Sequence, residues 1–287
     1  MPSVVNTNLI SLNSQRALSS SQSSLATSMQ RLSSGLRVNS AKDDAAGLAI
    51  SERMNAQVRG MNVAIRNAND GISLVQTAEG AMAKVGDSLQ RMRELAVQAR
   101  NATNSSSDKD SLDKEFGELA KEIQRVLGGT TFNGKAILAS EAGTLTFQIG
   151  ANTTTDDSID IITDNLQSNA TITVIAGTDN TGSARGTINS AADTTTIATV
   201  INNIDDAIDL VNNTRATFGA TQSRFDAIVA NLMVSAENQT AARSRIMDAD
   251  FAAETAAMSR AQILQQAGNA MVAQANQLPQ QVLKLLG

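Results

Sequence analysis

The stretch GTTFNGKA, residues 129–136, is the clearest candidate for chemistry in the chain. Its spacing, G-x-x-x-x-G-K, begins a phosphate-binding loop, in which backbone N–H groups and the lysine hold phosphate oxygens. The next position of that motif requires a hydroxyl for Mg²⁺, and Ala136 stands there. The residues before the stretch are typical of a helix rather than of a buried strand, and Asn133-Gly134 is a strong signal for a type I′ hairpin. We therefore predict a turn, with a nucleotide site as the disfavoured alternative.

Paired carboxylates are the second candidate. Asp43 with Asp44, and Asp205 with Asp206, could in principle act as general acid and base. Adjacent side chains on a helix point about 100° apart, however, and both pairs lie near expected helix starts. Acidic residues at a helix start accept hydrogen bonds from free N–H groups and complement the helix dipole. We interpret both pairs as capping residues.

The absence of two residue types argues against enzyme chemistry. The 287 residues include no Cys and no His. The chain therefore has no disulfide, no thiolate nucleophile and no imidazole for proton transfer or metal binding. Chemistry by carboxylates or lysines remains open, but we expect no enzyme, no cofactor and no metal.

Charge and hydropathy exclude further classes. The net charge is -5 and no basic stripe is present, so nucleic-acid binding is not expected. No run approaches the roughly 20 apolar residues of a membrane span, and the amino end has no basic leader. We expect neither a membrane protein nor a cleavable signal peptide.

Apolar residues at alternating spacings of three and four predict five long helices. The first includes residues 18–36 and should stop at Gly35, after which Ser40 and Asp43 form a capping box for the next helix. The second keeps its register through Asp70-Gly71, so we predict one continuous helix of about 55 residues. The others include residues 112–126, 201–232 and 264–285.

Residues 141–196 differ from the rest of the chain and are called the insert below. Ser, Thr, Asn, Asp and Gly make up 34 of its 56 residues, and its seven acids face a single base, Arg185. The runs TLTFQI, IDII and TITVI favour short strands. Because so polar a segment offers little to bury, we expect the insert to be dispensable for assembly.

The two chain ends are poor in charge. Residues 1–36 carry only Arg16 and Arg31, and residues 261–287 carry only Lys284. A surface helix normally has a charged face, and a membrane-surface helix would have Lys and Arg there. Here the remaining faces are Ser, Asn, Gln and Ala. We infer that protein covers these helices on more than one side, which requires many copies of the chain.

The stretch LNSQRALSSSQSSLATSMQRLSSGLRVNSAKDDAAGLAISERM closely resembles the amino end of bacterial flagellins. TAARSRIMDADFAAETAAMSRAQILQQAGNAMVAQANQLPQQVLKLLG resembles their carboxyl end, and NDGISLVQTAEGAM, LQRMRELAVQA and TTFNGKAIL match in order. The likeness covers roughly residues 1–150 and 200–287. It implies a mainly α fold of long antiparallel coiled-coil helices with a small β insert. A terminal coiled-coil domain, residues 1–44 with 244–287, would form the inner tube of a filament. Residues 45–243 would form the surrounding shell, with the insert facing solvent and without large outer domains.

The resemblance also implies function and partners. The chain would be an extracellular structural subunit that polymerises with itself into the flagellar filament for motility. It would be exported unfolded through the type III apparatus, with an export chaperone, the filament cap and hook-junction proteins as partners. The residues expected to carry self-assembly are Leu18, Leu25, Met29, Leu32, Leu264, Met271, Leu278 and Leu285. A hook–filament junction protein of the same family is the main alternative.

A second surface follows from the resemblance alone. Flagellins that a vertebrate Toll-like receptor recognises present residues of the first long shell helix and its neighbour. The matching positions here are Gln90, Arg91, Leu95, Gln98 and Glu115. Recognition by such a receptor is therefore expected, although contacts with a neighbouring subunit would use the same side chains.

Overall fold

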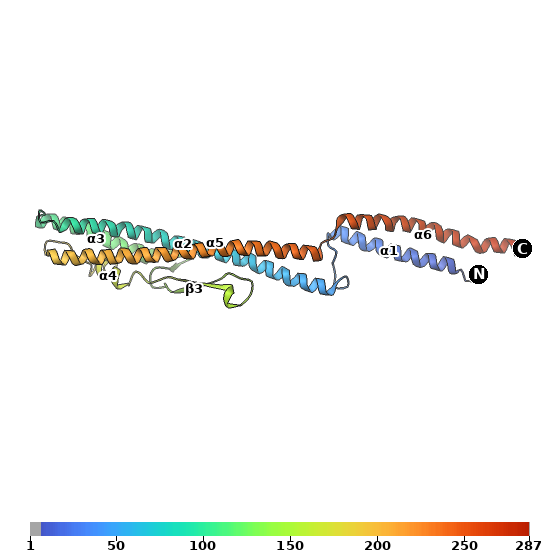
Figure 1. Ribbon diagram of the computed structural model, residues 1–287, viewed down its shortest axis with the longest axis horizontal. Coiled ribbons are helices and arrows are strands. Elements are labelled where there is room, and N and C mark those ends of the chain that lie inside the picture. Colours follow the sequence, from blue (N-terminus) through green and yellow to red (C-terminus); the bar gives the residue numbers. More distant parts are fainter. Residues whose placement is uncertain (1–6, 287) are drawn as a thin grey trace. The chain divides into compact units, whose positions relative to one another are not determined.

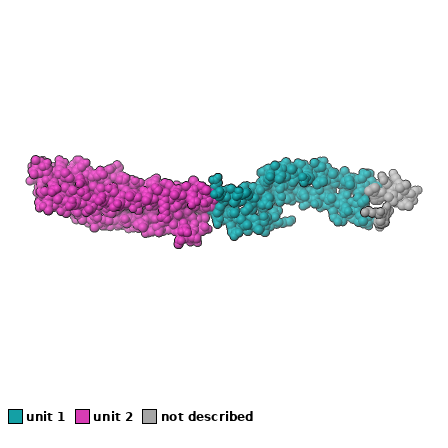
Figure 2. All heavy atoms as spheres, in the orientation of Figure 1, with its two compact units in different colours: residues 1–58, 237–287 teal, residues 59–236 magenta. Residues whose placement is uncertain are grey.

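The computed structural model describes residues 7–286, and the side chains of residues 7–277 (Figure 1). In chain order its elements are α1 (Leu9–Ser34), α2 (Ala45–Ala99), α3 (Ser106–Gly129), β1 (Thr131–Phe132), β2 (Lys135–Ala136), β3 (Thr144–Gln148), the 3-10 turn η1 (Thr155–Asp157), β4 (Ser158–Ile162), α4 (Ala170–Ala176), α5 (Thr194–Met247) and α6 (Phe251–Leu286). The chain divides into two compact units, residues 1–58 with 237–287 and residues 59–236, coloured separately in Figure 2. Within the described residues, no helix is both long and apolar enough to cross a membrane.

The predicted helices are confirmed, including the uninterrupted 55 residues of α2. The Asp70-Gly71 pair makes no turn, and Gly71 instead provides space for a side chain of α5. A Cβ atom at position 71 would lie 2.9 Å from Cζ of Phe225 on α5. At the end of α1, Gly35 adopts φ 70° and donates its N–H to the carbonyl of Arg31, as predicted for a helix stop.

The predicted caps at the two paired acids were wrong in part. The Asp43 carboxylate accepts the N–H of Ser40 at 2.9 Å and its hydroxyl at 3.0 Å, which holds its pKa below the usual range. These hydrogen bonds close a turn that precedes α2. The sequence pattern misled because an acidic side chain three residues after a serine can bind that serine in a turn as well as in a helix cap. The first turn of α2 is held by Asp44, which accepts the N–H of Gly47 at 2.8 Å.

Asp205 and Asp206 are not at a helix start, which corrects the second capping prediction. The helix α5 begins at Thr194, where Asp193 accepts the N–H of Thr196 at 2.7 Å. The threonine run 194–196 hid this start, because threonine is a poor helix former. Asp205 instead binds Arg93 of α2, with 2.6 Å between its Oδ1 and the arginine Nε.

The stretch of the phosphate-loop motif is a hairpin, as predicted. The strands β1 and β2 pair antiparallel, with Phe132 opposite Lys135. Between them Asn133 has φ 50° and Gly134 has φ 81°, and a type I′ turn requires positive values at both positions. Neither side of the motif has the strand-to-helix geometry that holds phosphates in such loops.

The insert is folded, and only two of its three predicted strands exist. The runs TLTFQ and SIDII form the antiparallel pair β3 and β4. TITVI lies in the helix α4, so its prediction as a strand was wrong. Asn169 caps that helix by accepting the N–H of Thr171 at 2.9 Å, and Gly177 ends it. Burial also has a helical period, because Ile172, Ile175 and Ala176 share the covered face.

The insert contributes to the core of the unit formed by residues 59–236, so the expectation that it buries little was wrong. The helices α2, α3 and α5 supply large buried side chains such as Met92, Phe116 and Phe218. The same cluster contains apolar residues of the insert, namely Ile149, Ile159, Ile161, Leu166, Ile172, Ile175, Ala176, Ile188 and Ala192. Composition misled here because the few apolar residues of the insert are those that face inward.

Three helix glycines fit the insert closely. A Cβ atom at Gly60 would lie 2.8 Å from the Ala151 side chain. At Gly117 it would lie 3.1 Å from the Arg185 guanidinium, and at Gly128 it would lie 2.8 Å from the Gln167 amide. Glycine inside a helix costs about 0.5–1 kcal/mol relative to alanine. At these three positions glycine therefore lowers helix stability but allows close contact with the insert.

Two glycines of α2 allow a matched test of this packing. Gly71→Ala is expected to destabilise the protein by about 1 kcal/mol or more, because overpacking against Phe225 outweighs the gain in helix propensity. Gly80→Ala is expected to stabilise it by about 0.5–1 kcal/mol, since no heavy atom lies within 4 Å of the added Cβ. Thermal denaturation followed by circular dichroism measures both. Equal effects at the two positions would contradict the packing at Gly71.

Candidate functional site

The helices α1 and α6 pack side by side as an antiparallel pair (Figure 1). Ser11 of α1 donates its hydroxyl to Oδ1 of Asn276 at 2.8 Å, and near the other end of the pair Arg31 binds Glu254 at 2.9 Å. Between these points the less exposed side chains of both helices recur at alternating spacings of three and four, which is typical of a coiled coil. They are Ser11, Ser14, Leu18, Ser21, Leu25, Ser28 and Leu32 of α1, with Met258, Ala261, Gln265, Gly268, Val272 and Ala275 of α6.

Three of the six residues on the contact face of α6 are small. Ala261 and Ala275 are buried, and Gly268 lies beside Leu18. A Cβ atom at position 268 would come within 3.2 Å of Cδ1 of that leucine. Small residues allow the two helix backbones to approach closely, and the large apolar side chains of Leu264 and Met271 lie outside the contact.

Large apolar side chains therefore remain exposed on both helices of this pair. Met29 of α1 is 55% exposed, and Leu264 and Met271 of α6 are 51% and 57% exposed. Other exposed apolar residues of the pair are Leu9, Ile10, Leu12, Phe251 and Ile263. No charged residue lies between 261 and 277, so α6 has no charged face over this length. Exposed large apolar side chains without a charged face beside them, as on α6, are typical of a protein contact.

The predicted assembly residues separate into two groups. Leu18, Leu25 and Leu32 are half-buried in the contact between α1 and α6. Met29 of α1 and Leu264 and Met271 of α6 are exposed and lie outside that contact. The side chains of the remaining two, Leu278 and Leu285, lie outside the described residues.

The predicted receptor residues lie on α2 and α3. Gln90, Arg91 and Gln98 of α2 and Glu115 of α3 are exposed. Arg91 contacts Glu94 at 2.9 Å and Glu115 at 2.8 Å, and these hydrogen bonds raise the pKa of the guanidinium. Since all three side chains are about half exposed, the ion pairs contribute little to stability.

Leu95 is the exception to that surface. It is 1% exposed and belongs to the core, because it follows Met92 by three residues on the buried side of α2. Leu95 therefore supports the surface from beneath instead of forming part of it.

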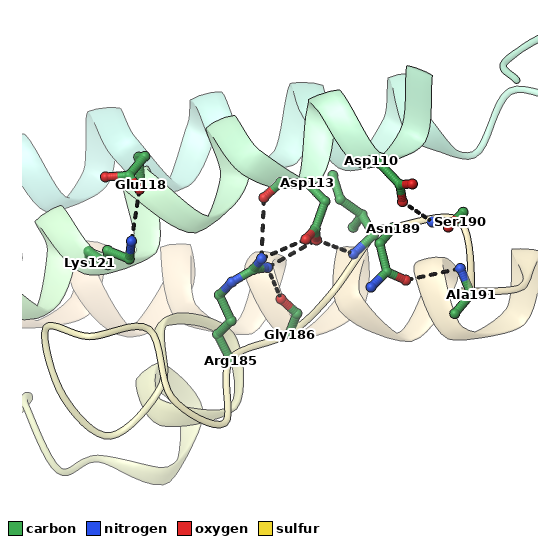
Figure 3. A network of polar contacts seen from close by, with 10 residues as sticks. Asp110, Asp113, Glu118, Lys121, Arg185, Gly186, Asn189, Ser190 and Ala191 are labelled. Carbon is green, nitrogen blue, oxygen red and sulfur yellow. Dashed lines mark hydrogen bonds and ion pairs between the residues drawn. The ribbon is translucent and has the colours of Figure 1, made fainter. Parts of the chain in front are cut away.

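A polar cluster between α3 and the insert was not predicted from the sequence. Arg185 binds Asp113 of α3, and Asp110 accepts the N–H of Ser190 at 2.9 Å (Figure 3). The single signal in the sequence was that Arg185 is the only basic residue among 56. Among residues 7–286, no cluster of three or more acidic side chains is placed to hold a metal ion.

Comparison with known proteins gives a consistent result over nearly the whole chain. The profile of the bacterial flagellin N-terminal helical region matches residues 5–144, and that of the C-terminal helical region matches residues 201–286. The chain is 43% identical to the flagellin of Halalkalibacterium halodurans over 283 residues, covering 99% of each. It is 43% identical to the flagellin of Bacillus subtilis over 305 residues, covering 98% of this chain and 99% of the relative. A crystal structure of Bacillus cereus flagellin matches at 32% identity with a TM-score of 0.47, covering 62% of this chain and 94% of that one.

Proposed function

This chain belongs to the bacterial flagellin family, and from that premise we propose how its helical ends build a filament. The protein is a structural subunit of the extracellular flagellar filament and not an enzyme, and its main partner is another copy of itself. We place residues 1–44 with 244–287 in the inner tube and residues 45–243 in the shell around it.

One observation carries this proposal: the large apolar side chains of α1 and α6 that the helix pair itself leaves exposed. Met29, Leu264 and Met271 are each about half exposed, and α6 has no charged residue between positions 261 and 277. Completing the burial of one such side chain contributes about 1 kcal/mol. Three of them per subunit contribute about 3 kcal/mol, which corresponds to roughly a hundredfold change in affinity. Neighbouring copies in the tube gain this free energy each time a subunit is added.

Seeded growth tests the proposal. Purified protein is mixed with short filament fragments, and growth is followed by electron microscopy and by amide hydrogen exchange. We expect filaments, with exchange of residues 9–34 and 251–277 slowed on assembly because the exposed sides of both helices become covered. Filaments in which these residues exchange as fast as in the free protein would rule out their place in the inner tube.

We propose further partners on the same grounds. The chain is exported unfolded through the type III apparatus and folds at the filament tip under the cap. At the base of the filament, its first copies contact the hook-junction proteins. An export chaperone covers the apolar face around Leu264 and Met271 before assembly. A chaperone complex that leaves these two side chains open to chemical labelling would contradict this part.

A vertebrate Toll-like receptor is the last partner that we propose, at the surface formed by Gln90, Arg91, Gln98 and Glu115. The support is that these four side chains are exposed and that Arg91 of α2 contacts Glu115 of α3. The double variant Arg91→Ala, Gln98→Ala is expected to activate a receptor reporter cell at least tenfold less, because arginine is enriched among residues that dominate protein contacts. Lys84→Ala on the same helix is the control, with a side chain that is 76% exposed. Equal activation by both variants would remove this surface from the proposal.

A further inference from the structure

Residues 177–192, called the strap below, connect α4 to α5 without a helix or strand of their own. Irregular segments of this length are uncommon in compact domains, so the contacts that hold the strap in place need an explanation. The backbone hydrogen bonds of the strap stay within it or reach α4, as in the bond from the Gly186 N–H to the carbonyl of Ile175. Among the described residues, no backbone-to-backbone hydrogen bond joins the strap to α3.

Arg185 makes the charged connection to α3 (Figure 3). The amide of Gln124 on α3 also donates a hydrogen bond to the carbonyl of Gly177, at the start of the strap. Nη2 of Arg185 lies 2.6 Å from Oδ2 of Asp113 and its Nη1 lies 3.0 Å from Oδ1, so the carboxylate is bound at both oxygens. The same guanidinium donates to the carbonyl oxygens of Asp113 and Gly186, and it lies 5.9 Å from the ring centroid of Phe116. The two charged side chains are only 16% and 12% exposed.

The surroundings of Arg185 are shaped for this contact. Gly117 leaves room for the guanidinium, since a Cβ atom there would lie 3.1 Å from it. Ala184, just before Arg185, has φ 58°, a left-handed conformation that costs free energy in a residue with a Cβ atom. Such a conformation persists only where neighbouring contacts compensate for it. Here the compensating contact is made by the next residue, Arg185, with Asp113.

Asp113 also organises the next part of the strap. Its Oδ1 accepts the N–H of Ile188 at 2.8 Å, and the Ile188 side chain is fully buried in the core. One turn earlier on α3, Asp110 accepts the N–H of Ser190. A carboxylate as buried as Asp113 needs a positive partner, and Arg185 is the only base in the insert.

We propose that Arg185 and Asp113 form a latch that closes the strap over α3, and that the strap opens and recloses as a unit while α2, α3 and α5 remain helical. The three helices contact one another through their own apolar side chains, such as Met82, Phe116 and Phe218, which belong to the helices and not to the strap. Breaking the latch therefore weakens the attachment of the strap to α3 without removing the contacts between helices. The buried side chain of Ile188 and the hydrogen bond from Gln124 to Gly177 are then among its remaining attachments. Local opening of this kind is a normal property of weakly connected segments.

Amide hydrogen exchange of the full-length protein tests the latch. In the variant Arg185→Met, the amides of Ile188 and Ser190 are expected to exchange at least tenfold faster than in the unchanged protein. Helix amides facing the core, such as those of Met92 and Phe218, should exchange at an unchanged rate, and the helical circular dichroism should be the same. Arg185→Lys should give an intermediate rate, because an ammonium group cannot bind both carboxylate oxygens in the planar arrangement of arginine.

Two controls separate the latch from general destabilisation. Lys121→Met removes a cation of α3 that lies beside Gly182 and pairs with exposed Glu118, and it should leave the exchange of Ile188 and Ser190 unchanged. The double variant Asp113→Asn, Arg185→Met should open the strap no more than Arg185→Met alone, because both substitutions break the same ion pair. Unchanged exchange in Arg185→Met would overturn the latch. Loss of helical signal, or helix amides accelerated by the same factor as the strap, would overturn its independent opening.

Discussion

Replacing residues 152–190 by a short Gly/Ser linker is expected to abolish the cooperative unfolding of the unit formed by residues 59–236. The replacement removes β4, α4 and most of the strap, and with them several fully buried side chains such as Ile159, Ile161 and Ile175. Each contributes about 1.5–3 kcal/mol when buried. Their sum is comparable to the total stability of an ordinary domain, about 5–15 kcal/mol. The polar composition of the insert predicts the opposite result, a dispensable surface segment.

Neighbouring isoleucines and valines of the insert allow the same test with single substitutions. Ile161 is 1% exposed, whereas Ile162, the next residue of β4, is 62% exposed. Ile161→Ser is expected to cost about 3 kcal/mol or more, because it removes buried apolar atoms and places a hydroxyl in the core. Ile162→Ser should change the stability by less than about 0.5 kcal/mol.

Thermal and denaturant unfolding, followed by circular dichroism, measures these effects. In α4 the pair Ile175→Ser and Val174→Ser should show the same contrast, since Ile175 is buried and Val174 is exposed. If the linker protein melts like the unchanged protein, or if Ile161→Ser is as mild as Ile162→Ser, the insert does not belong to the core.

The features that could be predicted from sequence are those that repeat or that a single dipeptide determines. A spacing of three and four persists through α2, and it correctly outweighed Asp70-Gly71 as a turn signal. Asn133-Gly134 correctly outweighed the phosphate-loop spacing, because a type I′ turn depends on just those two residues. Both kinds of feature are local, and local patterns are sufficient to determine them.

The insert could not be predicted because its structure depends on distant contacts. TITVI has β-type residues, yet Asn169 and Gly177 at its ends make it a helix against the core. Likewise, no local pattern relates Arg185 to Asp113, which lies 72 residues earlier in the chain. The interaction follows from the fold, and it becomes visible only when the strap is placed on α3.

The register of α6 could not be read from its largest apolar residues. Leu264 and Met271 have the spacing of a coiled-coil seam, and sequence reasoning placed them in it. The face that meets α1 instead contains the small residues Ala261, Gly268 and Ala275. Two helices approach more closely through small residues, and the large side chains are then available to other copies of the chain.

Leu264→Asp is therefore expected to prevent filament growth while leaving the free subunit almost unchanged. Leu264 is 51% exposed in the single chain, so the substitution leaves the contact with α1 intact and should lower the melting temperature little. In the proposed inner tube the new carboxylate would be buried without a partner, and the apolar contact would be lost as well. Together these effects cost at least about 3 kcal/mol per added subunit. The free subunit concentration needed for seeded growth should then rise by roughly a hundredfold or more.

Two further variants make the result specific to the exposed face. Met271→Asp should act like Leu264→Asp, because it lies two helix turns further along the same face. Gln266→Asp introduces the same charge at an exposed position on another side of α6, and it should raise the required concentration far less. The concentration is measured as the free protein that remains when growth on filament fragments stops. Normal growth of Leu264→Asp protein would mean that this face stays in solvent in the filament, and α6 would then have to enter the tube in another orientation.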